Sequence, residues 1–181
     1  ELTGDKGAVY SIEPIPGTFS FLKNNIRKLN LRNAIPLNFA ISNNEEMVQM
    51  AIPRYNKGGE NLYEAKIPEK GSTIPGSTEI RVKATTLDKL LLDKVSRISF
   101  IKCDTEGHEL FCFLGAAGIL ERDRPNLQVE INEDFTDRQT HAYQLVSLLK
   151  GMGYIIYSFD GKRFCPCSAK TDAVNYVFST G

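Results

Sequence analysis

The stretch ISFIKCDTEGHELFCFLGA, residues 98–116, decides the fold. An apolar run of strand length leads into four ionisable residues, and an apolar run with helical spacing follows them. Charged groups at the end of a buried strand are costly to desolvate unless something compensates them. These groups are therefore either solvated at the rim of a sheet or turned toward a ligand.

Strands and helices alternate on both sides of this stretch. The patterns predict strands at 8–12, 34–41, 45–53, 77–85, 97–104, 126–132, 154–164 and 173–180, and helices at 17–30, 86–95, 107–123 and 137–153. Helical crossovers join parallel strands, whereas the last two strands have no helix between them. We therefore expect an α/β fold of the doubly wound type, with a mostly parallel sheet and an antiparallel C-terminal strand pair.

Two expected helices are amphipathic enough to assign their buried faces. Thr18 is the expected N-cap of the first helix. That helix should bury Phe19, Leu22, Ile26 and Leu29. The helix after the acids should bury Leu110, Phe111, Leu114 and Ile119.

The length of 181 residues indicates a single domain that spans residues 1–181. Residues 53–77 are dense in glycine, proline and polar residues, so we expect an irregular excursion or binding loop there. The chain begins at Glu1 without an initiator methionine or a signal-peptide pattern, and we expect it to be a piece of a longer protein.

The composition argues against several classes of partner. Lysine plus arginine and aspartate plus glutamate each number 22, and a net charge of zero does not favour nucleic acid. No apolar run of about 18 residues and no polybasic cluster points to a membrane. Cys103 and Cys112 lie in apolar segments, and Cys165 and Cys167 lack the second pair that a zinc site needs. We expect four free thiols in a reducing, cytoplasmic compartment.

Three expected strands finish in an acid, namely Glu13, Asp104 and Glu130. Ligands of parallel α/β sheets bind beyond the carboxyl ends of the strands, so we expect these acids to converge at one rim. A carboxylate at the position of Glu13 can accept hydrogen bonds from both hydroxyls of a ribose. The alternative for Glu13 is an acid that caps the following helix.

The residues around Gly107 are the candidates for chemistry. Asp104 and Glu106 can orient a cationic ligand, bind a metal or take a proton from a hydroxyl, and His108 is the neighbour that titrates near neutral pH. We expect Glu109 to be a solvated first-turn acid and His141 to be a surface residue. A competing arrangement is a magnesium site. Its ligands would be Asp104, Glu130 and Asn132.

The order of elements and four stretches resemble the FkbM-type family of S-adenosylmethionine-dependent methyltransferases. These stretches are GAVYSIEPIPGTFSFLKNNIRKLNL, LNFAIS, VKATTLDKLL, and the segment from ISFIKCDTEGHELFCFLGAAGIL to RPNLQVEIN. The resemblance covers nearly the whole chain to about Asn132 and then becomes looser. It implies a class I methyltransferase fold that is Rossmann-like and uses S-adenosyl-L-methionine.

The resemblance also implies roles for individual residues. Glu13 would take the ribose of the cofactor, with Pro14 and Ile15 near it. Ala40 and Ile41 would border the adenine. Asp104 would lie near the methionine end of the cofactor and near the acceptor. The family mostly methylates hydroxyl oxygens of sugars, polyketides and related small molecules, and the candidate bases for the hydroxyl proton are Glu106 and His108.

One departure from the family concerns a glycine-rich strand and loop, of the type Asp-x-Gly-Ala-Asn-x-Gly, which this sequence lacks. We expect that first strand to be missing from between the strands that end at Glu13 and Asp104, and upstream residues to supply it. Two other functions stay open: a non-catalytic interaction domain on the same scaffold, and a magnesium-dependent hydrolase that uses the same carboxylates.

Overall fold

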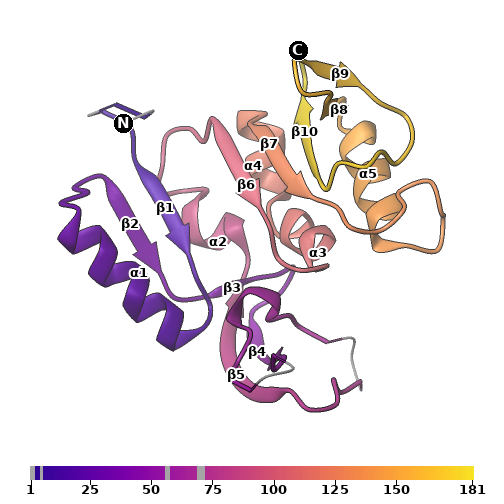
Figure 1. The fold of residues 1–181 in the computed structure, drawn as a ribbon. Helices are drawn as coiled ribbons and strands as arrows, with labels where there is room; N and C mark the ends of the chain where they lie inside the picture. Colours follow the sequence, from indigo (N-terminus) through magenta and orange to yellow (C-terminus); the bar gives the residue numbers. More distant parts are fainter. Residues whose placement is uncertain (1–2, 5, 56–57, 69–71) are drawn as a thin grey trace. The chain divides into compact units, whose positions relative to one another are not determined.

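The computed structural model describes residues 3–4, 6–55, 58–68 and 72–181. By their internal contacts, the residues divide into two compact units, Glu1–Thr85 and Thr86–Gly181. Each unit is described by itself, and the single domain expected from the length stays a prediction. Figure 1 traces the elements of both units in chain order.

The first unit opens with a strand, a helix and a parallel strand, as the sequence predicts. These elements are β1 (Val9–Ile12), α1 (Pro16–Lys28) and β2 (Ala34–Leu37), and β1 pairs with β2 in parallel from Val9↔Ala34 to Ile12↔Leu37. Two expectations for α1 are wrong. Its N-cap is Ile15 rather than Thr18, because Pro16 supplies a preset φ at the first helical position. Leu29 lies beyond the end of α1 and is 68% exposed.

The strand expected at 34–41 is split in the structure. Its second part, β3 (Ala40–Ile41), leaves β2 and pairs in parallel with β5 (Thr78–Thr85). On its other side β5 pairs antiparallel with β4 (Glu46–Ile52) along seven residue pairs. Among its described residues, the expected excursion between β4 and β5 is irregular apart from a short 3-10 helix, η1 (Leu62–Glu64), and two isolated bridges.

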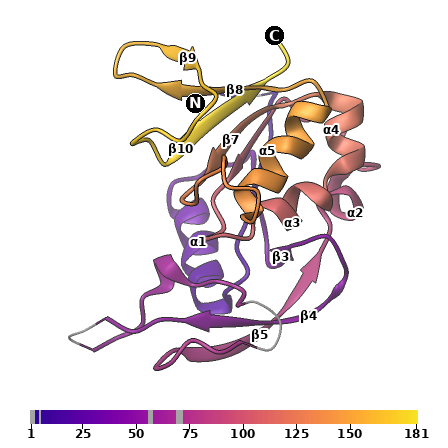
Figure 2. The same cartoon turned by 90° about the vertical axis from the view of Figure 1, so that its right-hand side faces the viewer.

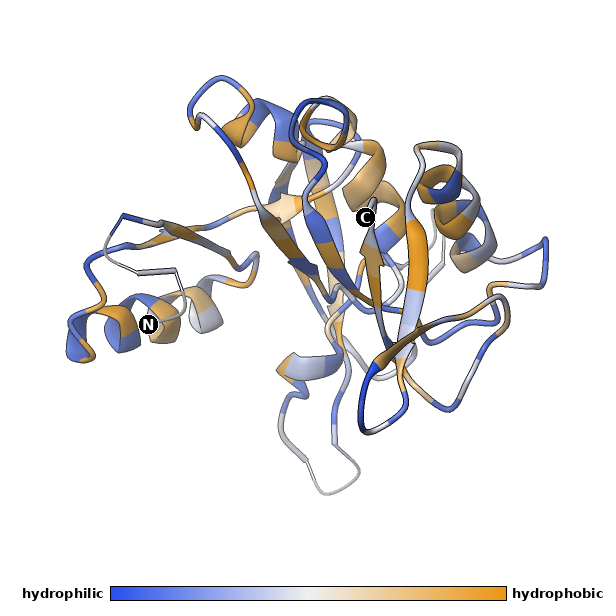
Figure 3. Ribbon diagram, turned by 90° about the horizontal axis from the view of Figure 1, so that it is seen from above, coloured by the Kyte–Doolittle hydropathy of each residue, from blue (hydrophilic) through white to orange (hydrophobic). Residues whose placement is uncertain are grey.

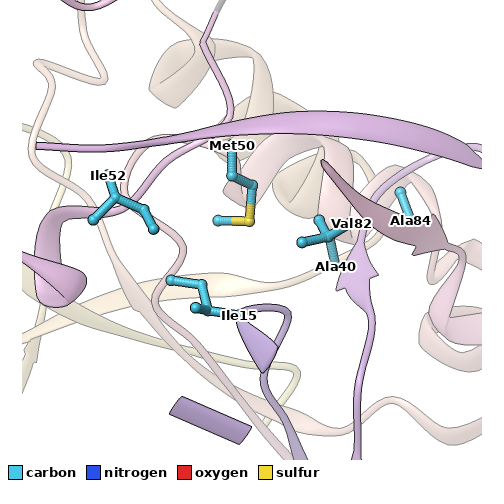
Figure 4. Close-up of a cluster of buried hydrophobic side chains, with 6 residues drawn as sticks. All are labelled: Ile15, Ala40, Met50, Ile52, Val82 and Ala84. Carbon is cyan, nitrogen blue, oxygen red and sulfur yellow. The ribbon is translucent and has the colours of Figure 1, made fainter. Parts of the chain in front are cut away.

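The core of the first unit packs Ile15, which lies between β1 and α1, against the three-stranded sheet. Figure 4 shows its buried side chains, which are Ile15, Ala40, Met50, Ile52, Val82 and Ala84. Alternate residues of β5 point into this cluster, as the period of two of a half-buried strand requires.

The second unit contains a five-stranded sheet with helices on one face. Its strands, in spatial order, are β6 (Phe100–Cys103), β7 (Asn126–Glu130), β10 (Asn175–Ser179), β8 (Ile155–Phe159) and β9 (Phe164–Pro166). Its helices are α2 (Leu87–Leu91), α3 (Glu109–Leu114), α4 (Ala117–Asp123) and α5 (His141–Gly151). Figure 2 shows α3, α4 and α5 along one face of β7, β10 and β8.

Buried side chains fill the space under these helices. The fully buried residues of the sheet include Leu127, Val129, Ile156, Tyr176 and Phe178. Figure 3 shows hydrophobic residues along the strands and polar residues in the loops between them. Cys103 and Cys112 are buried in this core as expected, and all four cysteines are free thiols.

The single helix expected at 107–123 is two helices, α3 and α4. Asp88 separates them, because its carboxylate accepts hydrogen bonds from Gly118 N at 2.8 Å and Ile119 N at 2.9 Å and so caps α4. The break turns Leu114 outward to 43% exposure, so its predicted burial is wrong.

The mixed α/β class is confirmed, but the described strands form three sheets with mixed pairing rather than one mostly parallel sheet. The C-terminal strands β8 and β10 are antiparallel as expected, and β10 also pairs antiparallel with β7. In its own unit β1 pairs with β2, and β6 is an edge strand paired with β7. The strand expected to be missing between β1 and β6 stays a prediction.

Candidate functional site

The loop that follows β6, residues 104–109, is called the acidic loop here. It turns sharply, because Glu106 and Gly107 both have left-handed backbone conformations, with φ of 53° and 95°. A non-glycine residue in this conformation costs about 1 kcal/mol. The loop therefore needs contacts that hold it in place.

Glu109 supplies those contacts. Its Oε1 accepts hydrogen bonds from Thr105 N at 2.8 Å, Thr105 Oγ1 at 3.0 Å and Gly107 N at 3.2 Å. The residue is only 8% exposed, so the expectation of a solvated acid is wrong. Three donors compensate its desolvation and tie the start of α3 back to the end of β6.

Asp104 lies at the end of β6 and is paired with a cation. Lys102 Nζ lies 2.6 Å from Asp104 Oδ2, with both side chains about half exposed. The hydrogen bond from Lys102 holds the pKa of Asp104 below its ordinary value. Asp104 is therefore ionised at neutral pH and is a weak base.

Glu130 ends the neighbouring strand β7, and its environment raises its pKa rather than lowering it. Burial raises the pKa of Glu130, and a hydrogen bond with the Asp104 carboxyl raises it further. Like charges in contact disfavour ionisation, so the contact with Asp104 acts on Glu130 in the same direction as its burial. Oε2 of Glu130 is also buried and receives no hydrogen bond from the part of the chain that the structure describes.

Carboxylate oxygens of Asp104, Glu106 and Glu130 all lie within 4.8 Å of one another. Two acids from adjacent strand ends and one from the acidic loop therefore meet, as the sequence predicts for Asp104 and Glu130. Such a group has the oxygen chemistry of a cation site. Glu106 takes the place that the sequence suggested for Asn132, which is exposed.

His108 and His141 both contact the ring of Phe111. His108 stacks on Phe111 with ring centroids 4.7 Å apart, and His141 meets the same ring edge-on at 5.1 Å. His141 is thus half-buried, rather than the surface residue that the sequence suggested. Burial, followed by the charge of His141, lowers the pKa of His108 to about 4, so its imidazole is neutral at pH 7.

A small hollow lies beside the acidic loop within the second unit. Its lining includes Gly107, Glu130, Asn132 and His141. Its volume of about 30 Å³ is enough for one or two water molecules.

Glu13 follows β1 in the first unit and is half-buried. Its Oε1 accepts a hydrogen bond from Ile15 N at 2.8 Å, and Ile15 is the N-cap residue of α1. Glu13 therefore caps the start of α1, which is the alternative role that the sequence left open for it. Burial raises the pKa of its carboxyl despite this bond.

The other residues assigned to the cofactor by resemblance lie close to Glu13 along the same unit. Ile15 and Ala40 are 6% and 4% exposed, and both side chains belong to the core cluster in Figure 4. Pro14 and Ile41 are half-buried. The backbones at the ends of β1 and β3 are thus fixed by packing.

One residue near Glu13 was missed by sequence reasoning. Asn38 Nδ2 donates to the carbonyl oxygens of Glu13 at 2.7 Å and Pro14 at 3.0 Å. The only signal for it in the sequence is an amide side chain in an otherwise apolar run, where β2 ends. The predicted convergence of Glu13 with Asp104 stays a prediction, because the two residues belong to different units.

Comparison with known families places these residues in context. The model of the methyltransferase FkbM domain matches residues 1–156, which include Glu13, the acidic loop and Glu130. The chain belongs to the FkbM methyltransferase family. Among curated proteins, none matches this FkbM-family chain.

A solved structure supports the same fold. The chain is similar to the crystal structure of methyltransferase FkbM from Methylobacillus flagellatus KT, with a TM-score of 0.56 and 14% sequence identity. The alignment covers 96% of this FkbM-family chain and 36% of that protein, so the chain spans about a third of that protein's length. No helix among the described residues is long and apolar enough to cross a membrane.

Proposed function

We propose that this chain is the catalytic region of an S-adenosylmethionine-dependent methyltransferase that acts on a hydroxyl oxygen. The observation that carries the proposal is the family match over residues 1–156, which includes both the Glu13 junction and the acidic loop. The same match disfavours the interaction-domain and hydrolase alternatives.

The residues at the end of β1 fit the cofactor chemically. Oε1 of Glu13 is occupied by Ile15 N, and no other described residue donates to the carboxylate, so its second oxygen is available to a ribose hydroxyl. Glu13 would hold the ribose, with Pro14 beside it and Ala40 and Ile41 along the adenine. When bound, S-adenosylmethionine supplies a methyl group on a sulfonium centre.

The second unit provides the groups for the acceptor. A hydroxyl must lose its proton as its oxygen is methylated, and a carboxylate can take that proton. Glu106 is the proposed base and Asp104 a positioning anion. His108 stays a second candidate base, because a pKa of about 4 leaves its imidazole neutral at pH 7, with a basicity like that of a carboxylate.

The acceptor class is a sugar or another small molecule with a hydroxyl group. The excursion at 53–77, part of which lies outside the described residues, is a proposed source of further acceptor contacts. Cytoplasmic localisation also remains a proposal.

Calorimetry and a transfer assay on the full-length protein test the function. Titration with S-adenosylmethionine should release or absorb heat, and a panel of monosaccharides and hydroxylated small molecules should yield a product heavier by one methyl group. Glu13→Ala should abolish binding, while Glu46→Ala, at an exposed position on β4, should not. A folded protein that does not bind the cofactor would support the non-catalytic interaction domain instead. Hydrolysis that needs no cofactor and is inhibited by a chelator would favour the magnesium-dependent hydrolase.

A further inference from the structure

Two asparagines clamp opposite ends of the β1–β2 pair. At the start of β1, Asn33 Nδ2 donates to the carbonyl oxygen of Gly7 at 3.0 Å. It also contacts Gly4 O at 3.3 Å and Thr3 Oγ1 at 3.1 Å. At the end of β1, Asn38 Nδ2 spans the carbonyls of Glu13 and Pro14.

The clamp at Asn38 is needed because the strand ladder stops there. The last ladder bond runs from Glu13 N to Leu37 O at 3.0 Å, and the next residue, Pro14, has no N–H to continue it. No backbone N–H of the described residues donates to the carbonyls of Glu13 and Pro14. Asn38, the first residue after β2, uses both hydrogens of one amide nitrogen to hold them.

Glu13 is thus constrained from two directions. Ile15 N holds one oxygen of its carboxylate, and Asn38 holds the backbone carbonyls on either side of the Glu13–Pro14 peptide bond. Together these bonds restrict where the second carboxylate oxygen lies. Recognition of a vicinal diol depends on that position, because hydrogen bonds weaken steeply with misalignment.

We propose that Asn38 is the positioning residue for Glu13 in the recognition of the cofactor's ribose. The inference rests on the proposed function, since it assumes that Glu13 meets an adenosine ribose. Asn38 acts through the backbone at the end of β1 and does not itself need to touch the ligand. Its contribution is to ribose discrimination rather than to the reaction.

Asn38→Asp in the full-length protein provides the test. At pH 8 the ionised side chain has no hydrogen to donate and faces two carbonyl oxygens. The affinity for S-adenosylhomocysteine should fall about 10-fold. The preference for adenosine over 2′,3′-dideoxyadenosine should fall toward unity, because the misplaced carboxylate no longer selects the hydroxyls.

Lower pH should rescue the variant in part. A protonated side chain can donate one hydrogen bond, so the affinity of the variant relative to the wild type should recover between pH 8 and pH 5.5. The wild type is measured at each pH, because the carboxyl of Glu13 also titrates and its pKa is raised by burial. The preference for adenosine over 2′,3′-dideoxyadenosine should recover together with the affinity, and recovery of the affinity without the preference would assign Asn38 a purely structural role.

Asn33→Asp is the matched control, since it places the same charge against carbonyls at the other end of the strand pair. It should lower stability while it preserves the preference for adenosine. If Asn38→Asp does not fold, Asn38→Ser and Asn33→Ser replace the pair. The inference about Asn38 is overturned if the two substitutions change the preference for adenosine equally, or if Asn38→Asp weakens binding and leaves the preference unchanged. Either result leaves the proposed function standing. A folded wild type that does not bind S-adenosylhomocysteine overturns the proposed function as well.

Discussion

The carboxylate of Glu109 lies 2.8 Å from the backbone nitrogen of Thr105, four residues earlier in the chain. This contact closes the acidic loop on itself and lets Glu106 keep a left-handed conformation. An acid that the sequence places on a solvated helix end is instead the internal support of the loop. The positions of Asp104 and Glu106 depend on it.

Removing this support should destabilise the second unit. Glu109→Ala leaves three donors without their acceptor in a buried setting, and the free energy of unfolding should fall by about 2 kcal/mol. Urea denaturation followed by circular dichroism measures the change. Glu121→Ala, on the exposed side of α4, is the control and should change stability by less than about 0.5 kcal/mol. Equal effects of the two variants would show that Glu109 does not support the loop.

Glu130→Gln should stabilise the protein at alkaline pH. Burial and the contact with Asp104 raise the pKa of Glu130 in the folded state above its ordinary value of 4.5, so the folded state holds the proton more tightly than the unfolded state. The contribution of Glu130 to stability is therefore fully present below about 4.5 and is lost as pH rises through the raised pKa. The amide keeps a donor toward Asp104 without the charge, so its advantage over the wild type should be larger at pH 8 than at pH 5. Urea midpoints at the two pH values decide this, and a pH-independent difference contradicts it.

Lys102→Met should raise the pKa of Asp104. The hydrogen bond from Lys102 is the largest cause of the lowered pKa, and the substitution removes it while it keeps the length of the side chain. Because its folded pKa is lowered, Asp104 stabilises the fold at pH values above its unfolded pKa, near 3.8. This stabilisation is lost as the pH falls through the folded pKa. Carbon-detected NMR titration of the carboxyl measures the shift directly. An unchanged pKa would assign the low value to another neighbour.

His108 should titrate near pH 4. The chain has two histidines, so single substitutions to glutamine assign both imidazole resonances in an NMR titration. Because the folded pKa is about 4 and the ordinary value is 6.5, the neutral ring stabilises the fold above about 6.5, and this effect is lost as pH falls toward 4. His141→Gln should raise the pKa of His108 only slightly, since burial is the larger cause. A titration of His108 near 6.5 would mean that its ring is solvated.

Much of the local structure could be predicted from the sequence, because apolar spacing is a local property. Patterns in single segments were enough to predict α1 between two parallel strands and the two strands β4 and β5. The same holds for the acids at the ends of β6 and β7. The parallel pairing of those strands brings Asp104 and Glu130 together.

The contacts that shape the candidate sites could not be predicted in this way. Asn38 reaches the Glu13 carbonyl across 25 positions, and Asp88 caps α4 across 30. Local periodicity carries no information about such partners.

The sequence by itself therefore determined the approximate positions of the strands and helices, because side-chain spacing follows the backbone period. Only the tertiary structure decided which polar groups turn inward. Glu109 is buried, and the helix expected at 107–123 is interrupted where Asp88 caps α4. Each buried donor or acceptor must find a partner wherever the folded chain brings one.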